Sequence, residues 1–180
     1  MLNKSVLTVV LLGITLVILV HSKIDFTNVK CISFDNSTMY FDICLLKSVN
    51  RTYKYLTISA RLPRKQPTND IKVNFAMLRK ENGYKPFLYN ITIDACKYLR
   101  TRNNPVIRFA HQFFEKYSTI NRTCPYGQQD EVVDKLPVSH INNLVTNVLP
   151  SPLGDYVYQL TFYLYGKKLA IVKVYASLMK

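Results

Sequence analysis

Two cysteines that bracket a short amphipathic segment constrain the fold of this chain more than any other feature. Cys96 follows an apolar, strand-like run, residues 87–93. Cys124 stands beyond the amphipathic residues 105–117, directly before Pro125. A disulfide between the two cysteines closes a loop of about 28 residues, which stabilises a fold by about 3 to 4 kcal/mol in the chain-entropy model. The pattern predicts a helix that is clamped to the end of a strand.

The segment between these cysteines has the composition of an amphipathic helix. Asn104 suits the N-cap, and Pro105 suits the first helical position, where its missing N–H costs nothing. His111 falls on the polar edge of the expected helix. Apolar residues recur at helical spacing, namely Val106, Phe109, Ala110, Phe113, Phe114 and Tyr117. Such a face either seals one end of a filled core or roofs a ligand cavity, and the pattern fits both roles.

Alternation of apolar and polar residues predicts strands along most of the remaining chain. We expect strands at residues 26–34, 39–46, 53–62, 70–79, 87–93, 131–136, 155–165 and 169–178. The last two strands form the clearest hairpin, because only a short turn containing Gly166 joins them. The rest of the segment from 127 to 154 is expected to be irregular.

The alternation also predicts which side chains point inward. In residues 39–46 the odd-numbered positions are apolar, whereas in residues 53–62 the even-numbered ones are. We expect a bulge or turn at about residues 47–52 to absorb this change, since one extra residue flips every later side chain. In the strand at 87–93, a glycan on Asn90 must face solvent, so Tyr89, Ile91 and Ile93 are expected to point inward.

These elements predict an all-β fold, an immunoglobulin-like antiparallel β-sandwich of seven or eight strands with one short inserted helix. Residues 23–180 suit a single domain. Four cysteines allow three pairings, and we favour Cys31–Cys44 and Cys96–Cys124, because each of these bonds closes a short loop between neighbouring elements.

The first 22 residues have the pattern of a secretory signal peptide. Lys4 precedes an almost wholly apolar run, residues 5–20, and small residues around Ser22 suit signal cleavage. An uncleaved signal anchor is the alternative. We expect a secreted, extracellular protein with no transmembrane anchor after cleavage, and the even number of cysteines agrees with an oxidising compartment. Four N-glycosylation sequons point the same way, at Asn36, Asn50, Asn90 and Asn121.

The net charge and the absence of known catalytic motifs limit the classes of function that this chain can have. The net charge is +13 at pH 7. For a secreted chain this favours anionic lipid headgroups, sulfated glycans or acidic proteins as partners, rather than nucleic acid. The sequence has no metal-ligand spacing and none of the familiar catalytic motifs. We therefore expect no catalytic residues, no metal and no cofactor, and the interior becomes the candidate site.

Several motifs together resemble a known family. They are an early VKC strand with a second cysteine thirteen residues later, a strand that ends in ARLP, and the segments DACKYL, NRTCPYG and PLGDYVYQL. The chain from about residue 26 to 178 resembles the insect secreted proteins of unknown function that include the CheB chemosensory proteins. That family is considered a distant relative of the ML lipid-recognition proteins, such as the ganglioside activator. The resemblance implies an ML-like sandwich whose sheets part around a lipid, and it supplies no catalytic residue.

We accordingly expect a hydrophobic pocket between the sheets, roofed by the helix. Its predicted lining consists of the residues whose side chains are expected to point inward from the strands and the helix, namely Phe75, Met77, Tyr89, Ile91, Phe109, Phe113, Leu160 and Phe162. Basic residues at the rim would hold an anionic headgroup, with Arg100, Arg102 and Arg108 as candidates. Two functions stay open. One is binding of a lipid or other hydrophobic small molecule, with a chemosensory role among the options. The other is an extracellular interaction module with a filled core, which binds another extracellular or receptor protein.

Overall fold

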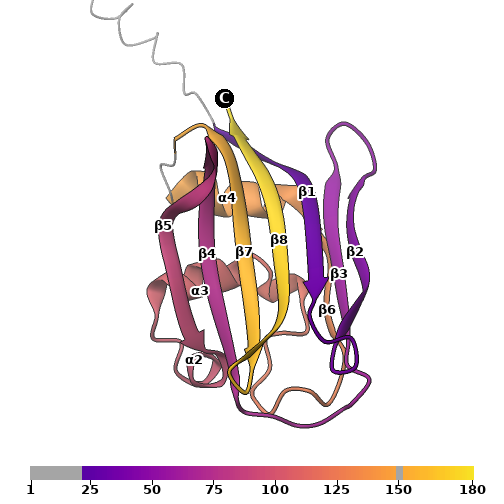
Figure 1. Cartoon of the computed structure of the whole chain (residues 1–180). Coiled ribbons are helices and arrows are strands. Elements are labelled where there is room, and N and C mark those ends of the chain that lie inside the picture. Colours follow the sequence, from indigo (N-terminus) through magenta and orange to yellow (C-terminus); the bar gives the residue numbers. More distant parts are fainter. Residues whose placement is uncertain (1–21, 149–151) are drawn as a thin grey trace, which may run out of the picture.

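The computed structural model describes residues 22–148 and 152–180 (Figure 1). Apart from Ser22, the predicted signal segment lies outside the described residues. The described ranges contain eight strands, which form two antiparallel sheets. This arrangement confirms the predicted antiparallel β-sandwich. No helix within these ranges is long and apolar enough to cross a lipid bilayer.

The larger sheet has five strands in the order β1-β8-β7-β4-β5, and the smaller has three in the order β2-β3-β6. The larger sheet consists of β1 (Lys23–Ser33), β4 (Ile71–Glu81), β5 (Gly83–Asp94), β7 (Gly154–Leu164) and β8 (Lys167–Met179). The smaller sheet consists of β2 (Tyr40–Ser48), β3 (Lys54–Arg61) and β6 (Glu131–Pro137). The predicted last hairpin, β7–β8, pairs Tyr158 with Val174 and Leu160 with Val172.

Helices complete the layer that the smaller sheet begins. They are α2 (Ala95–Thr101), α3 (Pro105–Gln112) and α4 (Val138–Val148), with a 3-10 turn, η1 (Glu115–Tyr117), after α3. Residues Ile107 and Ala110 of α3 pack against Phe75 of β4, and α4 contacts β1, β3 and β6. The helices therefore face the five-stranded sheet from the same side as β3 and β6 (Figure 1).

The helical content differs from the prediction of one helix over residues 105–117. Helix α3 ends at Gln112, and only the short turn η1 follows it. Helix α2 was not predicted, although Asp94 caps it by accepting a hydrogen bond from the Lys97 amide at 2.8 Å. Helix α4 occupies part of the segment that was expected to be irregular, where buried Ile141 and Val145 lie one turn apart.

The change of inward face occurs inside β2, not in the turn after it. The pairing of β2 with β3 shifts between Phe41 and Ile43, which is a β-bulge at Asp42. As a result Ile43 and Leu45 lie exposed, whereas Cys44 is half-buried. The prediction that Phe41, Ile43 and Leu45 share one face was therefore wrong. In β5 the predicted face is confirmed, with Asn90 exposed and the neighbouring isoleucines half-buried.

One disulfide connects the two sheets directly, and the other connects the end of β5, through α2, to the segment that leads to β6. Cys31 of β1 bonds Cys44 of β2, and these strands belong to different sheets. Cys96 of α2, directly after β5, bonds Cys124 in the segment that leads to β6. Both bonds follow the predicted pairing. They fasten the layers at the two sides of the molecule, near β1 and near α2 (Figure 1).

Candidate ligand-binding cavity

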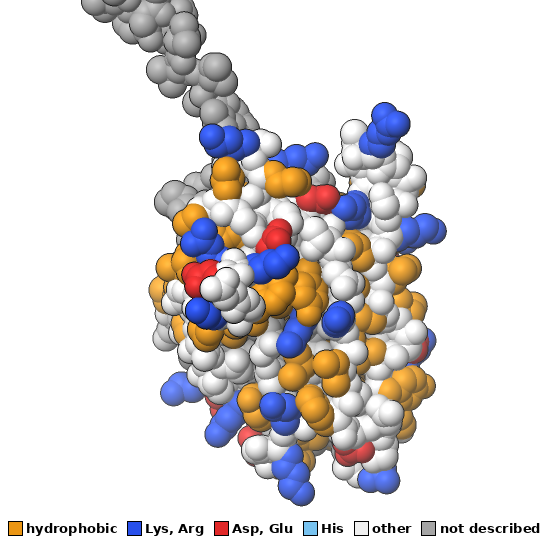
Figure 2. All heavy atoms as spheres, turned by 45° about the horizontal axis from the view of Figure 1, so that its top comes forward, with side chains coloured by type: hydrophobic (Ala, Val, Ile, Leu, Met, Phe, Trp, Pro, Cys, Tyr) orange, Lys and Arg blue, Asp and Glu red, His pale blue; other side chains and the backbone are white. Residues whose placement is uncertain are grey.

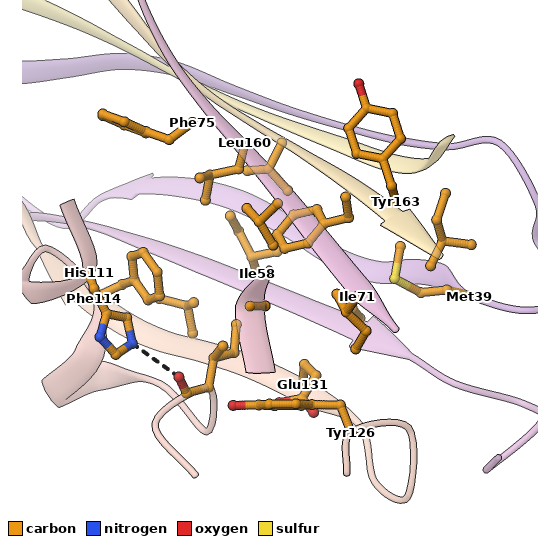
Figure 3. A pocket seen from close by; sticks show the side chains of 18 of the residues that line it. Met39, Ile58, Ile71, Phe75, His111, Phe114, Tyr126, Glu131, Leu160 and Tyr163 are labelled. Atoms are coloured by element: carbon orange, nitrogen blue, oxygen red, sulfur yellow. Dashed lines mark hydrogen bonds between the residues drawn. The ribbon is translucent and has the colours of Figure 1, made fainter. Parts of the chain in front are cut away.

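A cavity of about 460 Å³ lies between the two layers (Figure 3). This volume falls within the range of about 300–1,000 Å³ that is typical of small-molecule sites. Apolar side chains from every layer line it. The five-stranded sheet supplies Phe75, Leu160 and Phe162, the three-stranded sheet supplies Leu56, Ile58 and Val133, and the helices supply Ile107, Ala110 and Ile141. The interior is therefore hollow between the sheets.

Half of the predicted lining residues lie at the cavity. Phe75, Phe113, Leu160 and Phe162 line it. Met77, Tyr89, Ile91 and Phe109 do not, and pack into the surrounding hydrophobic clusters instead. Met77 does point inward as parity predicts, and it pairs with Tyr158 of β7 without a register shift, but it is packed among other core side chains instead of lining the cavity.

Helix α3 presents a different face from the one predicted. Its buried residues are Ile107, Ala110 and His111, at helical spacing, and all three line the cavity. Phe109 lies to one side, where its ring packs edge-on against Phe113 at 4.9 Å. The prediction of His111 on the polar edge was wrong. His111 follows Ala110, which points inward, so it lies close to the apolar face of the helix. Its hydrogen-bond partners, which the sequence does not show, determine whether it is buried.

His111 is held in its neutral form. Its side chain is 5% exposed, and its Nδ1 lies 2.7 Å from Nη1 of Arg102. Since a guanidinium only donates, Nδ1 accepts, and Nε2–H donates to the carbonyl of Ile120 at 3.1 Å. Burial lowers the pKa of His111 below its ordinary value, although the Ile120 carbonyl opposes this shift. The wall of the cavity at His111 is thus polar but uncharged.

The predicted rim arginines do not line the cavity. Arg100 and Arg108 are exposed on α2 and α3. Arg102 binds Glu115 at 3.0 Å in addition to His111, and its guanidinium lies 5.6 Å from the ring of Tyr98. The basic residue that does line the cavity is Arg64, in the connection between β3 and β4.

Arg64 was not among the predicted site residues. The inward residues of β3 are even-numbered, and Leu62, Arg64, Gln66 and Thr68 of the following connection also line the cavity. That connection does not continue the strand, because it bends at Pro63 and Arg64, and the Gln66 amide donates to the Arg64 carbonyl at 2.7 Å. The strand was predicted to end at Leu62, so its alternation gave no signal for Arg64.

The mouth of the cavity lies where two connections meet. Arg64, Gln66 and Tyr165 are the exposed lining residues in the described part of the chain. The Tyr165 amide donates to the carbonyl of Asp70 at 3.4 Å, which joins the β7–β8 turn to the β3–β4 connection. Both connections lie at the lower end of the molecule in Figure 1.

The polar groups inside the cavity are few. Glu131 is the acidic residue of the described lining; one carboxylate oxygen pairs with Arg122, and the other accepts from Thr119 Oγ1 at 2.9 Å. Burial raises the pKa of Glu131, while Thr119 and Arg122 oppose that shift. Tyr98 is 7% exposed, and its hydroxyl has no hydrogen-bond partner among the described residues. Near Glu131, burial raises the pKa of Tyr126 to about 12, so this phenol stays protonated.

No group of three or more metal-ligating His, Cys, Asp or Glu side chains occurs within residues 22–148 and 152–180. What the arrangement offers is an enclosed apolar volume with one charged side chain at its mouth. Such a site favours binding of a molecule that is mostly hydrocarbon.

Comparison with known protein families gives a match to the central part of the chain. No curated protein matches the sequence. A family described as "Protein of unknown function (DUF1091)" matches residues 73–159, which run from β4 into β7 and include α2, α3 and α4. The matched residues supply much of the cavity wall, including Phe75, Ala110 and His111. The chain therefore contains a DUF1091 domain at residues 73–159.

Proposed function

We propose that this protein is a secreted glycoprotein that binds a lipid or another hydrophobic small molecule between its two layers. The cavity of about 460 Å³ with its apolar wall is the observation that carries the proposal. Burial of hydrocarbon contributes about 0.8 kcal/mol for each CH₂ group. A chain of ten such groups would gain about 8 kcal/mol before the costs of association, so a single hydrocarbon tail suffices for useful affinity.

The surface supports the extracellular part of the proposal. All four sequon asparagines, Asn36, Asn50, Asn90 and Asn121, are exposed and so accessible to glycosylation. Two disulfides and no free cysteine in the described chain suit an oxidising compartment. The resemblance to chemosensory and ML proteins places chemosensory and lipid ligands among the candidates.

A second candidate function rests on the exposed apolar side chains of β1 and β2. Ile32 and Phe34 lie 42% and 53% exposed at the end of β1, and Ile43 and Leu45 lie 41% and 45% exposed on β2. β1 and β2 are edge strands of their sheets, and exposed apolar side chains on an edge strand offer a place where another protein can bind. This observation favours an extracellular interaction module, which would need no ligand in the cavity.

Native mass spectrometry of protein secreted by a eukaryotic host separates the two functions. A co-purified hydrophobic molecule, or uptake of a fluorescent fatty acid by delipidated protein, would support ligand binding. If the protein carries no ligand and takes up no probe, the ligand-binding function would be contradicted, and the interaction module would remain as the proposed function.

Substitution of Ala110 tests whether the cavity is the site. Ala110 lines the cavity, so Ala110→Phe should fill it, remove most of the probe uptake and leave the melting temperature nearly unchanged. Ala176 is 2% exposed in the packed core away from the cavity. Ala176→Phe should therefore destabilise by about 1 to 3 kcal/mol through overpacking. Equal destabilisation by both variants would show that the interior around Ala110 is filled.

A further inference from the structure

We propose that Arg64 is the headgroup subsite of this cavity, and that the ligand is a single-chain amphiphile with an anionic carboxylate or phosphate head. The hydrocarbon chain lies between the layers, and the anion lies at the mouth beside the Arg64 guanidinium. This inference rests on the proposed function and specifies its ligand class.

Arg64 differs from Arg61, Arg102 and Arg122 because it has no carboxylate partner among the described residues. Arg61 binds Asp42 and Asp130 at 2.6 and 2.7 Å, and Arg102 and Arg122 bind Glu115 and Glu131. Arg64 forms no ion pair with any described residue, and it is the basic residue among those that line the cavity. On the face shown in Figure 2, Lys and Arg side chains are scattered among hydrophobic ones rather than gathered in one patch. Arg64 thus stands out as a basic lining residue whose charge has no carboxylate partner among the described residues.

The backbone on both sides of Arg64 is fixed. The Leu62 amide donates to Asp130 Oδ1 at 3.0 Å, and Thr68 and Tyr126 exchange two backbone hydrogen bonds of 2.8 and 3.0 Å. Gly127 lies so close to Gln66 that a Cβ atom on it would come within 2.2 Å of the Gln66 carbonyl oxygen. The connection is therefore anchored, while the Arg64 side chain itself stays exposed. A fixed backbone lowers the entropy cost of presenting a guanidinium to a ligand.

An anion has no comparable place deeper in the cavity. His111 is neutral and uses both ring nitrogens, and the lining carries the carboxylate of Glu131. A buried anion without a partner is strongly disfavoured, and a second carboxylate near Glu131 would add repulsion. The head of the ligand must therefore remain at the mouth. A guanidinium binds carboxylate and phosphate through two parallel N–H···O bonds, which an alcohol cannot form.

The test compares ligands of equal chain length that differ only in the head. We would measure the Kd of a fatty acid, a monoalkyl phosphate and a fatty alcohol for wild-type protein, Arg64→Gln and Lys65→Gln. Lys65 is the matched control, because it is exposed, adjacent and outside the lining. Wild-type protein should prefer the anions over the alcohol by about 10-fold. Arg64→Gln should lose that preference and keep its affinity for the alcohol, and Lys65→Gln should behave like wild type.

The contrary results are distinguishable. Equal affinity of wild-type protein for the acid and the alcohol would overturn the headgroup subsite and leave the cavity intact. Equal loss of anion binding in Arg64→Gln and Lys65→Gln would assign the preference to general charge instead of to Arg64. No binding of any of the three ligands would overturn the proposed function together with the subsite.

Discussion

His111 makes the stability of the fold depend on pH. The fold binds the neutral imidazole, because Arg102 donates to Nδ1 and Nε2 donates to Ile120. Burial lowers the pKa of His111 below its ordinary value of 6.5, so below that pH the unfolded chain takes up a proton more readily than the folded protein. The contribution of His111 is therefore complete above about pH 6.5 and declines as the pH falls toward the folded-state pKa.

We predict that His111→Gln weakens the loss of stability on acidification. The free energy of unfolding, measured by urea titration between pH 7.5 and pH 5, should fall less steeply with pH in this variant than in wild-type protein. His140→Gln is the control, because His140 is only half-buried, with Nε2 3.1 Å from the Gln112 carbonyl and its ring 5.1 Å from the ring of Tyr117. Parallel pH profiles for wild type and His111→Gln would contradict the assignment. Burial raises the pKa of Glu131, so the contribution of Glu131 to stability changes with pH in the opposite direction to that of His111. Glu131 is present in all three proteins, so its contribution cancels when their pH profiles are compared.

Individual site residues could be predicted from the sequence only in part, because parity gives the direction of a side chain and not whether it meets a cavity or close-packed neighbours. Phe75, Leu160 and Phe162 lie at the cavity as parity predicted. Met77 also points inward, but it belongs to the packed core. Arg64 lies beyond a proline that normally ends a strand, and nothing in the sequence shows that the bent connection after that strand lines the cavity mouth.

At the level of strands and helices, alternation identified every strand and the face of β5. The sequence was less informative for helices. Helix α2 has only seven residues, too few for a long periodic pattern. Helix α4 does have apolar residues at helical spacing, Val138, Ile141 and Val145, but it follows β6 directly, with no turn to mark where the strand ends and the helix begins. The bulge in β2 arises where Asp42 reaches Arg61 of the neighbouring strand at 2.6 Å, a contact between residues far apart in the sequence. Local patterns cannot show such contacts.

The face of β5 leads to a paired prediction. Ile91 packs against the cluster of Phe75, Tyr98, Ile107 and Ala110, so Ile91→Asp places an unpaired charge in an apolar environment. The secreted amount of this variant should fall sharply. The side chain of Asn90 points outward, where it accepts from Asn74 at 2.8 Å, so Asn90→Gln should be secreted nearly as well as wild type. Immunoblotting of medium and cell extract measures both, and equal secretion of the two variants would refute the face assignment.

For the complete sandwich, the two disulfides determine how the layers can move. The Cys31–Cys44 bond fastens β1 to β2, and the Cys96–Cys124 bond fastens α2 to the segment before β6. Loops of this length contribute about 3 to 4 kcal/mol each by restricting the unfolded chain. In the folded protein they also oppose separation of the two sheets beside the cavity.

We predict that loss of the Cys31–Cys44 bond accelerates ligand release. The double variant Cys31→Ala, Cys44→Ala should release a bound fluorescent fatty acid faster than wild type in a stopped-flow displacement experiment. The melting temperature, measured on the same samples, shows whether the variant remains folded at the temperature of the experiment. An unchanged release rate in folded protein would show that the layers do not need to separate for exchange.

The anchored mouth has a consequence for timing. In the proposed function, a ligand between layers that are fastened at both sides would exchange through the end that carries Arg64, Gln66 and Tyr165. The length of time for which the protein keeps its cargo would then depend on one short connection as well as on the apolar side chains of the wall. Changes in that connection would tune residence time between related proteins, while the volume and chain-length preference of the cavity stay the same.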